Sequence, residues 1–284
     1  MAKPGRRNGG VRLVALALTA ASLVLTGCTT SAGTGNEPSL GDIVRQAIEE
    51  AKEQQGTGTG RTGSGSRDVR LDDGSNRSFD YDQYSAEIGG VLGSLDQYWS
   101  EALPQNFGVR YVKPRGGFFY YRSDEGGGPK CGDQPAPPKN AFYCPPGDFI
   151  AWDESGLLIP YYVQGGDFAA AFVLAHEYGH AMQARLPGVA RLPTVIKELQ
   201  ADCFAGAWSQ WLSLQDRGLE AGDLDEATVA VFSARDVPGT PFTDPRAHGT
   251  GFERTRAFGD GFEGGPRACQ PAAAENWVVN ERIR

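Results

Sequence analysis

The sequence predicts a single compact α+β domain over residues 79–284, in which long helices accompany a small antiparallel sheet. Two strongly apolar stretches, 167–186 and 194–214, have the length of helices. Four short runs rich in β-branched and aromatic residues lie between residues 108 and 153, separated by Gly and Pro clusters. Residues 28–78 are dominated by Gly, Ser, Thr and charged residues, so we expect them to form a flexible tether rather than a core.

The first 27 residues resemble a lipoprotein signal peptide. A basic segment, "MAKPGRRNGGVR", precedes the apolar run "LVALALTAASLVLTG", which is short for a membrane span. The residues "LTGC", ending at Cys28, resemble the bacterial lipobox, in which cleavage leaves a lipidated cysteine, expected to carry palmitate, as the new N-terminus. An ordinary signal peptide or anchor helix with an incidental cysteine is the alternative. We therefore expect a lipid-anchored protein on the extracytoplasmic face of the cell membrane.

Charge and cysteine content agree with export. Residues 1–27 carry four basic side chains and no acidic ones, so the formal net charge of -8 becomes -12 after cleavage. An acidic protein is a poor partner for nucleic acid. Once Cys28 is assigned to lipid, Cys131, Cys144, Cys203 and Cys269 remain, and two disulfides would suit an oxidising compartment. The sequence alone permits three pairings.

The domain begins with a predicted packing helix over 81–103 that ends before Pro104, and a second possible helix lies within the tether at 40–55. The predicted strands follow, as "GVRYVK", "GGFFYYR", "NAFYC" and "GDFIAWD". A disulfide between Cys131 and Cys144 would pin the intervening loop to this sheet and stabilise it by about 3 kcal/mol. The segment "DFIAWDES" is predicted to be an edge strand that can pair with an extended peptide.

Two of the three histidines lie on the first apolar helix, which is predicted to run from an N-cap at Asp167 to a stop at Pro187. His176 and His180 are four residues apart and therefore share a helix face, with Cβ atoms about 5–6 Å apart, so both imidazoles can reach one Zn²⁺. Glu177 lies about a third of a turn away, where a carboxylate can take a proton from a water on the metal. The alternative is a chance occurrence of a short motif.

The second apolar helix offers what a catalytic zinc site still lacks, since such sites normally use three protein ligands and leave one position for water. In "ELQAD", Glu198 and Asp202 share a face. Glu198 is the candidate third ligand, with a salt bridge to Lys or Arg as its alternative. Asp202 is predicted to accept the free N–H of a ligating imidazole. Without such partners, two buried carboxylates on an apolar helix would be strongly disfavoured.

The segments "HEYGHAMQ", "ELQADCFAGAW" and "AHGTGFERTRAFGDGF", with "CG" and "AFYCP" upstream, resemble the bacterial putative neutral zinc metallopeptidase family. The resemblance covers residues 81–269 and leaves out the tether and the C-terminal "PAAAENWVVNERIR". It implies a zincin-like α+β fold, with Glu177 as acid and base and with the zinc ligands His176, His180 and Glu198.

Two further groups are expected near this site. The third histidine, His248, and Arg254 lie in a Gly-punctuated loop and a possible short helix, and either could stabilise the oxyanion of a peptidase. A solvated or structural role is the alternative for His248, and a salt bridge to an acid is the alternative for Arg254. A bridge from Cys203 to Cys269 would fasten the tail against the second apolar helix, with a buried free thiol as the alternative.

The sequence thus predicts a monomeric, lipid-anchored zinc metallopeptidase that acts on a peptide or protein. Two alternatives stay open: a noncatalytic, zinc-stabilised envelope lipoprotein that works as a binding module, and a cell-wall amidase with the same zinc chemistry. Only the enzymes require Glu177, and the two enzymes differ in whether protein or peptidoglycan is degraded.

Overall fold

The computed structural model describes residues 79–215, 218–270 and 277–278. The predicted signal peptide, Cys28, the tether and the segment 40–55 lie outside the described residues. Contacts divide the chain into the units Met1–Ala47 and Ile48–Arg284, and every described residue belongs to the second. In the part of the chain that the structure describes, no helix is long and apolar enough to span a membrane.

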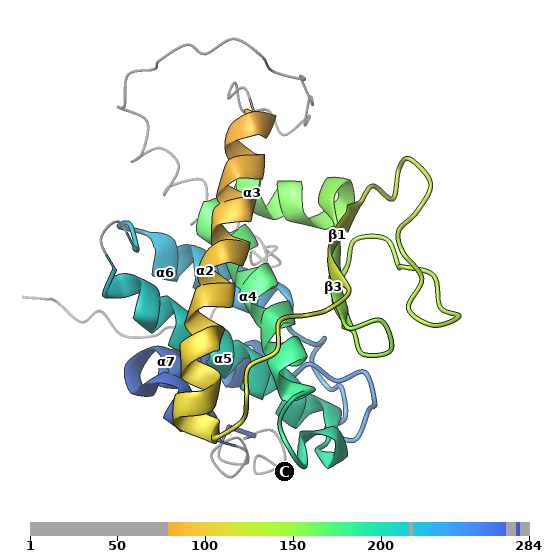
Figure 1. The fold of residues 1–284 in the computed structure, drawn as a ribbon. Coiled ribbons are helices and arrows are strands. Elements are labelled where there is room, and N and C mark those ends of the chain that lie inside the picture. Colours follow the sequence, from red (N-terminus) through yellow and green to blue (C-terminus); the bar gives the residue numbers. More distant parts are fainter. Residues whose placement is uncertain (1–78, 216–217, 271–276, 279–284) are drawn as a thin grey trace, which may run out of the picture. The chain divides into compact units, whose positions relative to one another are not determined.

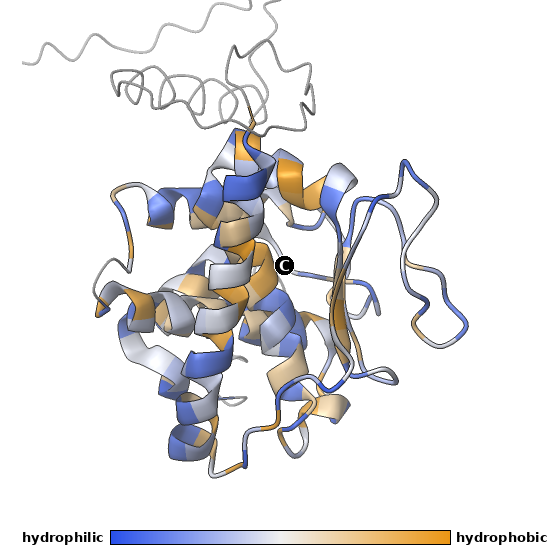
Figure 2. Cartoon of the chain, turned by 45° about the horizontal axis from the view of Figure 1, so that its top comes forward, coloured by the Kyte–Doolittle hydropathy of each residue, from blue (hydrophilic) through white to orange (hydrophobic). Residues whose placement is uncertain are grey.

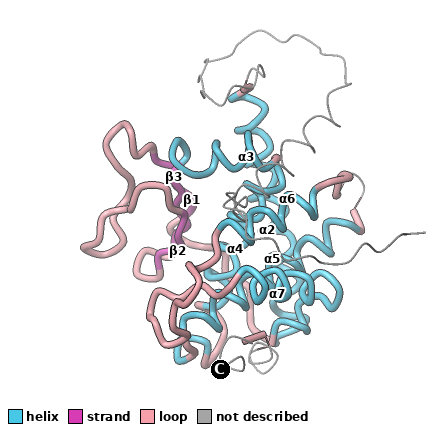
Figure 3. Tube along the Cα trace, turned by 180° about the vertical axis from the view of Figure 1, so that it is seen from behind, coloured by secondary structure: helices cyan, strands magenta, loops and turns pink. Residues whose placement is uncertain are grey.

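The domain combines helices with one small sheet, which confirms the α+β class. The helices are α2 (Tyr81–Phe107), α3 (Ile159–Gly165), α4 (Asp167–Gln183), α5 (Thr194–Ser213), α6 (Asp223–Ser233) and α7 (Gly251–Gly264), with short helical turns at Glu154–Leu158, Val189–Arg191 and Gly265–Cys269. The strands are β1 (Gly117–Tyr121), β2 (Ala141–Cys144) and β3 (Phe149–Asp153). The sheet lies at one side of the helices, and the long loop between β1 and β2 extends beyond it (Figures 1 and 3).

The first helix begins as its sequence predicts, because the Asp80 side chain accepts hydrogen bonds from the amides of Asp82 and Gln83. The predicted end before Pro104 is wrong, since α2 continues to Phe107. A proline removes one hydrogen bond, but the added turn packs the Phe107 ring edge-on against Phe204 of α5, with ring centroids 5.7 Å apart. The extension therefore depends on a tertiary contact.

The sheet is mixed rather than antiparallel, which corrects the prediction. Its order is β1-β3-β2, with β1 parallel and β2 antiparallel to β3. The loop after β1 carries the chain past the position of β3, so β1 and β2 are consecutive in sequence but are not neighbours in the sheet. The strand in "DFIAWDES" is consequently the central one, fully buried, and the edge strands are β1 and β2.

The predicted strand "GVRYVK" is also wrong, because residues 108–113 form no strand. The side chains and backbone of this segment instead contact α2, α4 and the residues just after α4. The Lys113 ammonium lies 2.9 Å from the Asp96 carboxylate on α2, the Tyr111 hydroxyl lies 2.6 Å from that of Tyr178 on α4, and the Val112 carbonyl accepts a hydrogen bond from Arg185. These contacts with helices, rather than pairing with a strand, hold the segment in place.

Helices α4 and α5 form the centre of the domain, and most of their residues are buried, as their composition predicts. α2, α5 and α6 pack against α4, and the sheet lies beside α4 as well. Hydrophobic residues are concentrated where these elements meet, whereas the loops beyond the sheet are mostly hydrophilic (Figure 2). Gly179 lies at the crossing of α4 and α5, where a Cβ atom would lie only 3.2 Å from Cα of Ala201.

Two disulfides hold the described residues together. Cys131 is bonded to Cys144, and Cys203 is bonded to Cys269, so both predicted pairings are confirmed. The first ties the loop before β2 to the end of that strand. The second ties the turn after α7 to the middle of α5.

Candidate metal centre

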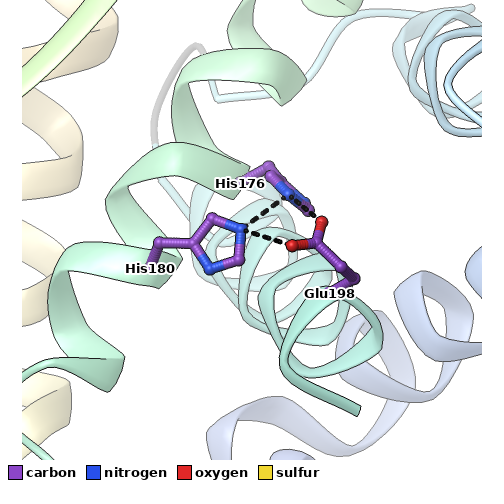
Figure 4. A group of neighbouring side chains, drawn as sticks. All are labelled: His176, His180 and Glu198. Carbon is purple, nitrogen blue, oxygen red and sulfur yellow. Dashed lines mark hydrogen bonds and ion pairs between the residues drawn. The ribbon is translucent and has the colours of Figure 1, made fainter. Parts of the chain in front are cut away.

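His176 and His180 lie on one face of α4, one turn apart, and Glu198 approaches them from α5 (Figure 4). The Nε2 atoms of the two imidazoles are 3.1 Å apart. Glu198 places Oε2 at 3.2 Å from His176 Nε2 and Oε1 at 3.4 Å from His180 Nε2. Three side chains that the sequence placed on two helices therefore converge on one point.

The chemistry of these atoms fits a zinc ion. The other ring nitrogen of each imidazole is hydrogen-bonded, to Asp202 for His176 and to Gln183 for His180, so both Nε2 atoms present lone pairs to each other and to a carboxylate. Such a cluster repels itself unless a cation or protons lie within it. Ligands about 2.0–2.1 Å from a tetrahedral zinc are about 3.3 Å from one another, close to the separations found here.

Electrostatics within the cluster agree with this view. Burial would lower the pKa of His176, but Asp202 and Glu198 outweigh it and raise this pKa to about 10. Burial would raise the pKa of Glu198, yet the two imidazoles hold it well below its usual range. Without a metal His176 therefore retains an additional proton at neutral pH, and a metal ion would have to displace it.

Asp202 links His176 to a buried arginine. Its Oδ1 atom accepts from Nδ1 of His176 at 2.8 Å, and both carboxylate oxygens accept from Arg254 of α7 at 2.8 Å. Arg254 also donates to the Ala234 carbonyl at 2.6 Å. Burial opposes ionisation of Asp202, but Arg254 outweighs burial and lowers the pKa of this carboxyl group. A charged Asp202 fixes the His176 tautomer that leaves Nε2 free.

Glu177 is buried on α4 beside the cluster, and its Oε2 atom accepts a 2.8 Å hydrogen bond from the backbone amide of Tyr143 on β2. The Asp153 amide donates to the Asn140 carbonyl, so alternate residues from Asn140 onward face β3. Ala141 and Tyr143 therefore direct their backbone groups away from the sheet. The outer edge of β2, and not β3, runs past Glu177.

A cavity of about 870 Å³ opens over the cluster. Its walls come from β2 and the residues before it, from α3, α4, α5 and α6, and from α7 with the segment that leads into it. They include His176, Glu177, His180, Glu198, Tyr161, His248 and Arg254. Its remaining walls are largely apolar, with Phe142, Leu157, Phe172 and Val189 among them. The site is thus a concave, mainly apolar pocket with a few convergent polar groups, the form that ligand sites commonly take.

The two residues predicted to stabilise an oxyanion have different surroundings. The His248 side chain is 50% exposed at the cavity, and its Nδ1 atom lies 3.4 Å from the Asp236 carboxylate. Arg254 is buried and directs its guanidinium to Asp202 and Ala234. Tyr161, which the sequence did not single out, also lines the cavity, and burial raises the pKa of its hydroxyl group, which therefore stays protonated.

Sequence reasoning also missed Gln183, whose side chain bonds His180. A spacing of three residues on a helix after a ligand histidine was the available signal. A further group of acidic side chains, Asp167, Asp223 and Glu226, has ligand atoms within 4.8 Å of one another where α4 begins beside α6. It contains no imidazole.

Comparison with known proteins points to one family. Residues 50–272 match the family described as "Putative neutral zinc metallopeptidase". The chain is 33% identical over 163 residues to "Uncharacterized protein YpfJ" of Escherichia coli K12, covering 51% of this chain and 54% of that protein. It is 32% identical over 132 residues to "Uncharacterized protein Rv2575" of Mycobacterium tuberculosis H37Rv, covering 42% of each. The chain thus spans about half the length of the curated relatives it matches, and no solved structure matches it significantly.

Proposed function

This chain belongs to the putative neutral zinc metallopeptidase family, and we propose that it is a zinc-dependent peptidase whose metal is held by His176, His180 and Glu198. The observation that carries the proposal is the convergence of two imidazole nitrogens and one carboxylate, 3.1–3.4 Å apart, in the wall of a cavity. The relatives' printed names describe no activity, so the substrate and reaction proposed here rest on the site and the family.

When bound, the zinc ion would polarise the scissile carbonyl and lower the pKa of a water molecule. Glu177 lies beside the cluster and would take a proton from the attacking water as the water oxygen bonds to the carbonyl carbon. The same carboxyl group would pass the proton to the leaving amine as the C–N bond breaks. The Tyr143 amide holds one oxygen of Glu177 and so directs the carboxylate toward the cavity.

Supporting roles go to residues around the cavity. Asp202 would orient His176, and we assign Arg254 to the support of Asp202, because its guanidinium is bonded there. His248 and Tyr161 both line the cavity and are our candidates to donate to the oxyanion. An extended peptide would pair with the outer edge of β2, where the backbone groups of Ala141 and the carbonyl of Tyr143 face away from β3, while the Tyr143 amide donates to Glu177.

The proposal includes the cell envelope as the place of action, with Cys28 lipidated and the chain anchored to the outer face of the membrane. Two disulfides among the described residues support an oxidising compartment. A monomer that acts on peptides or unfolded proteins is the expected form.

The first experiment measures zinc content and peptidase activity of the full chain together. Wild type is expected to hold one zinc, and Glu198→Ala is expected to lose it under mild chelation. Glu177→Gln should keep the zinc and the fold while cleavage of casein falls by at least about 100-fold, the low end of what a general base contributes.

Each alternative predicts a different result. A noncatalytic binding module would keep its biological activity in Glu177→Gln and would cleave nothing in wild type. A cell-wall amidase would degrade peptidoglycan and leave casein intact. Well-folded wild type without zinc would contradict the metallopeptidase proposal altogether.

A further inference from the structure

His180 is held by a neutral partner, unlike His176. Its Nδ1 atom lies 2.8 Å from Oε1 of Gln183, which is buried on the next turn of α4. The Gln183 Nε2 atom donates to the Lys197 carbonyl at 2.7 Å and to Oε1 of Gln200 at 3.1 Å. Gln200, which is fully buried on α5, donates in turn to the Cys269 carbonyl at 2.8 Å.

Two backbone carbonyls fix the direction of this chain of hydrogen bonds. A carbonyl only accepts, so the amide nitrogens of Gln183 and Gln200 must face Lys197 and Cys269, respectively. The Gln183 oxygen then faces His180, and because it can only accept, Nδ1 of His180 must carry a hydrogen. Neutral His180 is thereby left with its lone pair on Nε2, the atom that faces Glu198.

We propose that Gln183 is a positioning residue for His180, and that Gln200 and the disulfide-bonded Cys269 form its support. The relay of Gln183, Gln200 and Cys269 fixes the tautomer and ring orientation that present Nε2 to the metal. This inference rests on the proposed zinc site, and it goes further by assigning the orientation of the second ligand to side chains outside the metal cluster.

Burial and anchoring of the relay both favour a fixed orientation of His180. A buried primary amide costs free energy unless its donors and acceptors are paired, and the described partners pair both amides along the chain. The relay joins α4, α5 and the turn Gly265–Cys269, whose last residue is bonded to Cys203 of α5. A rigid end point is what allows a flexible glutamine to hold an imidazole in one orientation.

The test compares zinc affinity by chelator competition in the full chain. Gln183→Met keeps the side-chain volume and loses the acceptor, and a loss of about 10–100-fold in zinc affinity is expected, the usual effect of removing such a partner. Gln183→Glu keeps an acceptor for the Nδ1 hydrogen, but its second oxygen must carry a proton to donate to the Lys197 carbonyl as the amide does, so this variant should recover part of that loss. Gln215→Met, on an exposed residue just after α5, should bind zinc as wild type does.

The visible absorption spectrum of the cobalt-substituted proteins provides a second readout, because it reports ligand geometry rather than fold. The spectrum should change in Gln183→Met and return toward wild type in Gln183→Glu. If Gln183→Met does not fold, Gln200→Met decides, with a smaller expected loss of affinity, because Gln183 loses its bond to Gln200 but keeps its bond to the Lys197 carbonyl.

The outcomes separate this inference from the function on which it rests. A folded Gln183→Met or Gln200→Met with wild-type zinc affinity and cobalt spectrum overturns the relay while leaving the peptidase proposal intact. Equal losses in folded Gln183→Met and Gln183→Glu also overturn it, because the acceptor would then be irrelevant. A wild-type chain that binds no zinc overturns the proposed function itself.

Discussion

Asp202 is the residue on which the candidate site depends most, because it is shared between an imidazole and a guanidinium. It is completely buried, and its two oxygens accept three hydrogen bonds from His176 and Arg254. Burying a carboxylate is costly unless charged partners compensate it. The site therefore needs α7 as well as the two helices that carry the proposed metal ligands.

Replacing Asp202 by Asn should leave Arg254 as a buried cation without its counter-ion, at a cost of about 3–5 kcal/mol in unfolding free energy. Zinc affinity should fall by about 10–100-fold, because His176 loses its carboxylate partner. Urea unfolding and chelator competition measure the two effects. The double variant Asp202→Asn with Arg254→Met should be more stable than the sum of the single effects implies, and strict additivity would show that the pair is not coupled.

At the scale of elements, α7 reaches Asp202 because glycines let it approach α5. A Cβ atom on Gly261 would lie 2.0 Å from the Cys203 carbonyl oxygen, and one on Gly206 would lie 2.0 Å from that of Phe258. The two backbones are therefore nearly in contact. Larger residues would push α7 away and withdraw Arg254 from the site.

Gly261→Ala should destabilise the protein by at least about 1–3 kcal/mol, because its methyl group meets backbone that cannot move freely. Gly259 offers a matched control two residues earlier on the same helix, since a Cβ atom there has nothing within 4 Å. Gly259→Ala should stabilise by up to about 1 kcal/mol through helix propensity. Thermal melts of the two variants check the contrast, and equal effects would contradict close packing of α7.

The start of α4 beside α6 gives a pH prediction. Burial, together with Asp167 and Asp223, raises the pKa of Glu226 from 4.5 to about 7. A carboxyl group whose pKa is raised on folding stabilises the fold below pH 4.5, and this contribution is lost as the pH rises through 7. Ionised Glu226 therefore lowers the free energy of unfolding at alkaline pH.

In wild type, Glu226 accepts a 3.0 Å hydrogen bond from the Phe168 amide. Glu226→Gln keeps an oxygen for this bond but removes the charge. Its melting temperature should exceed that of wild type at pH 8 and match it near pH 4.5. Glu101→Gln, at an exposed position of α2, is the control and should shift neither value. A Glu226→Gln variant that is no more stable than wild type at pH 8 would show that the three carboxyl groups do not repel one another.

At the scale of the whole domain, the two disulfides differ in how much chain they close. Cys203 and Cys269 are 66 residues apart, whereas Cys131 and Cys144 are 13 apart. In the chain-entropy description, losing the longer link costs about 4 kcal/mol and losing the shorter one about 3 kcal/mol. Urea unfolding of the Cys→Ser pairs should rank them in this order, and the reverse ranking would contradict it.

The sequence by itself determined the parts that depend on local spacing. His176 and His180 share one helix face, and Glu198 and Asp202 share another, because positions four apart on a helix face the same way, and Glu177 lies next to the first face. The apolar composition of both helices predicted their burial, and the even number of cysteines predicted two disulfides. The pairing of Cys203 with Cys269 was one choice among three, and the structure has it.

Only the tertiary structure decided which distant segments meet. Strand order, the extension of α2 past Pro104, the position of β2 beside Glu177 and the contact of Arg254 with Asp202 depend on packing between segments far apart in the chain. Gln183 is part of the motif "HEYGHAMQ". That its oxygen accepts from His180 follows only from the carbonyls of Lys197 and Cys269, which lie far along the chain. Spacing along a helix fixes which side chains share a face, whereas long-range packing fixes what that face meets.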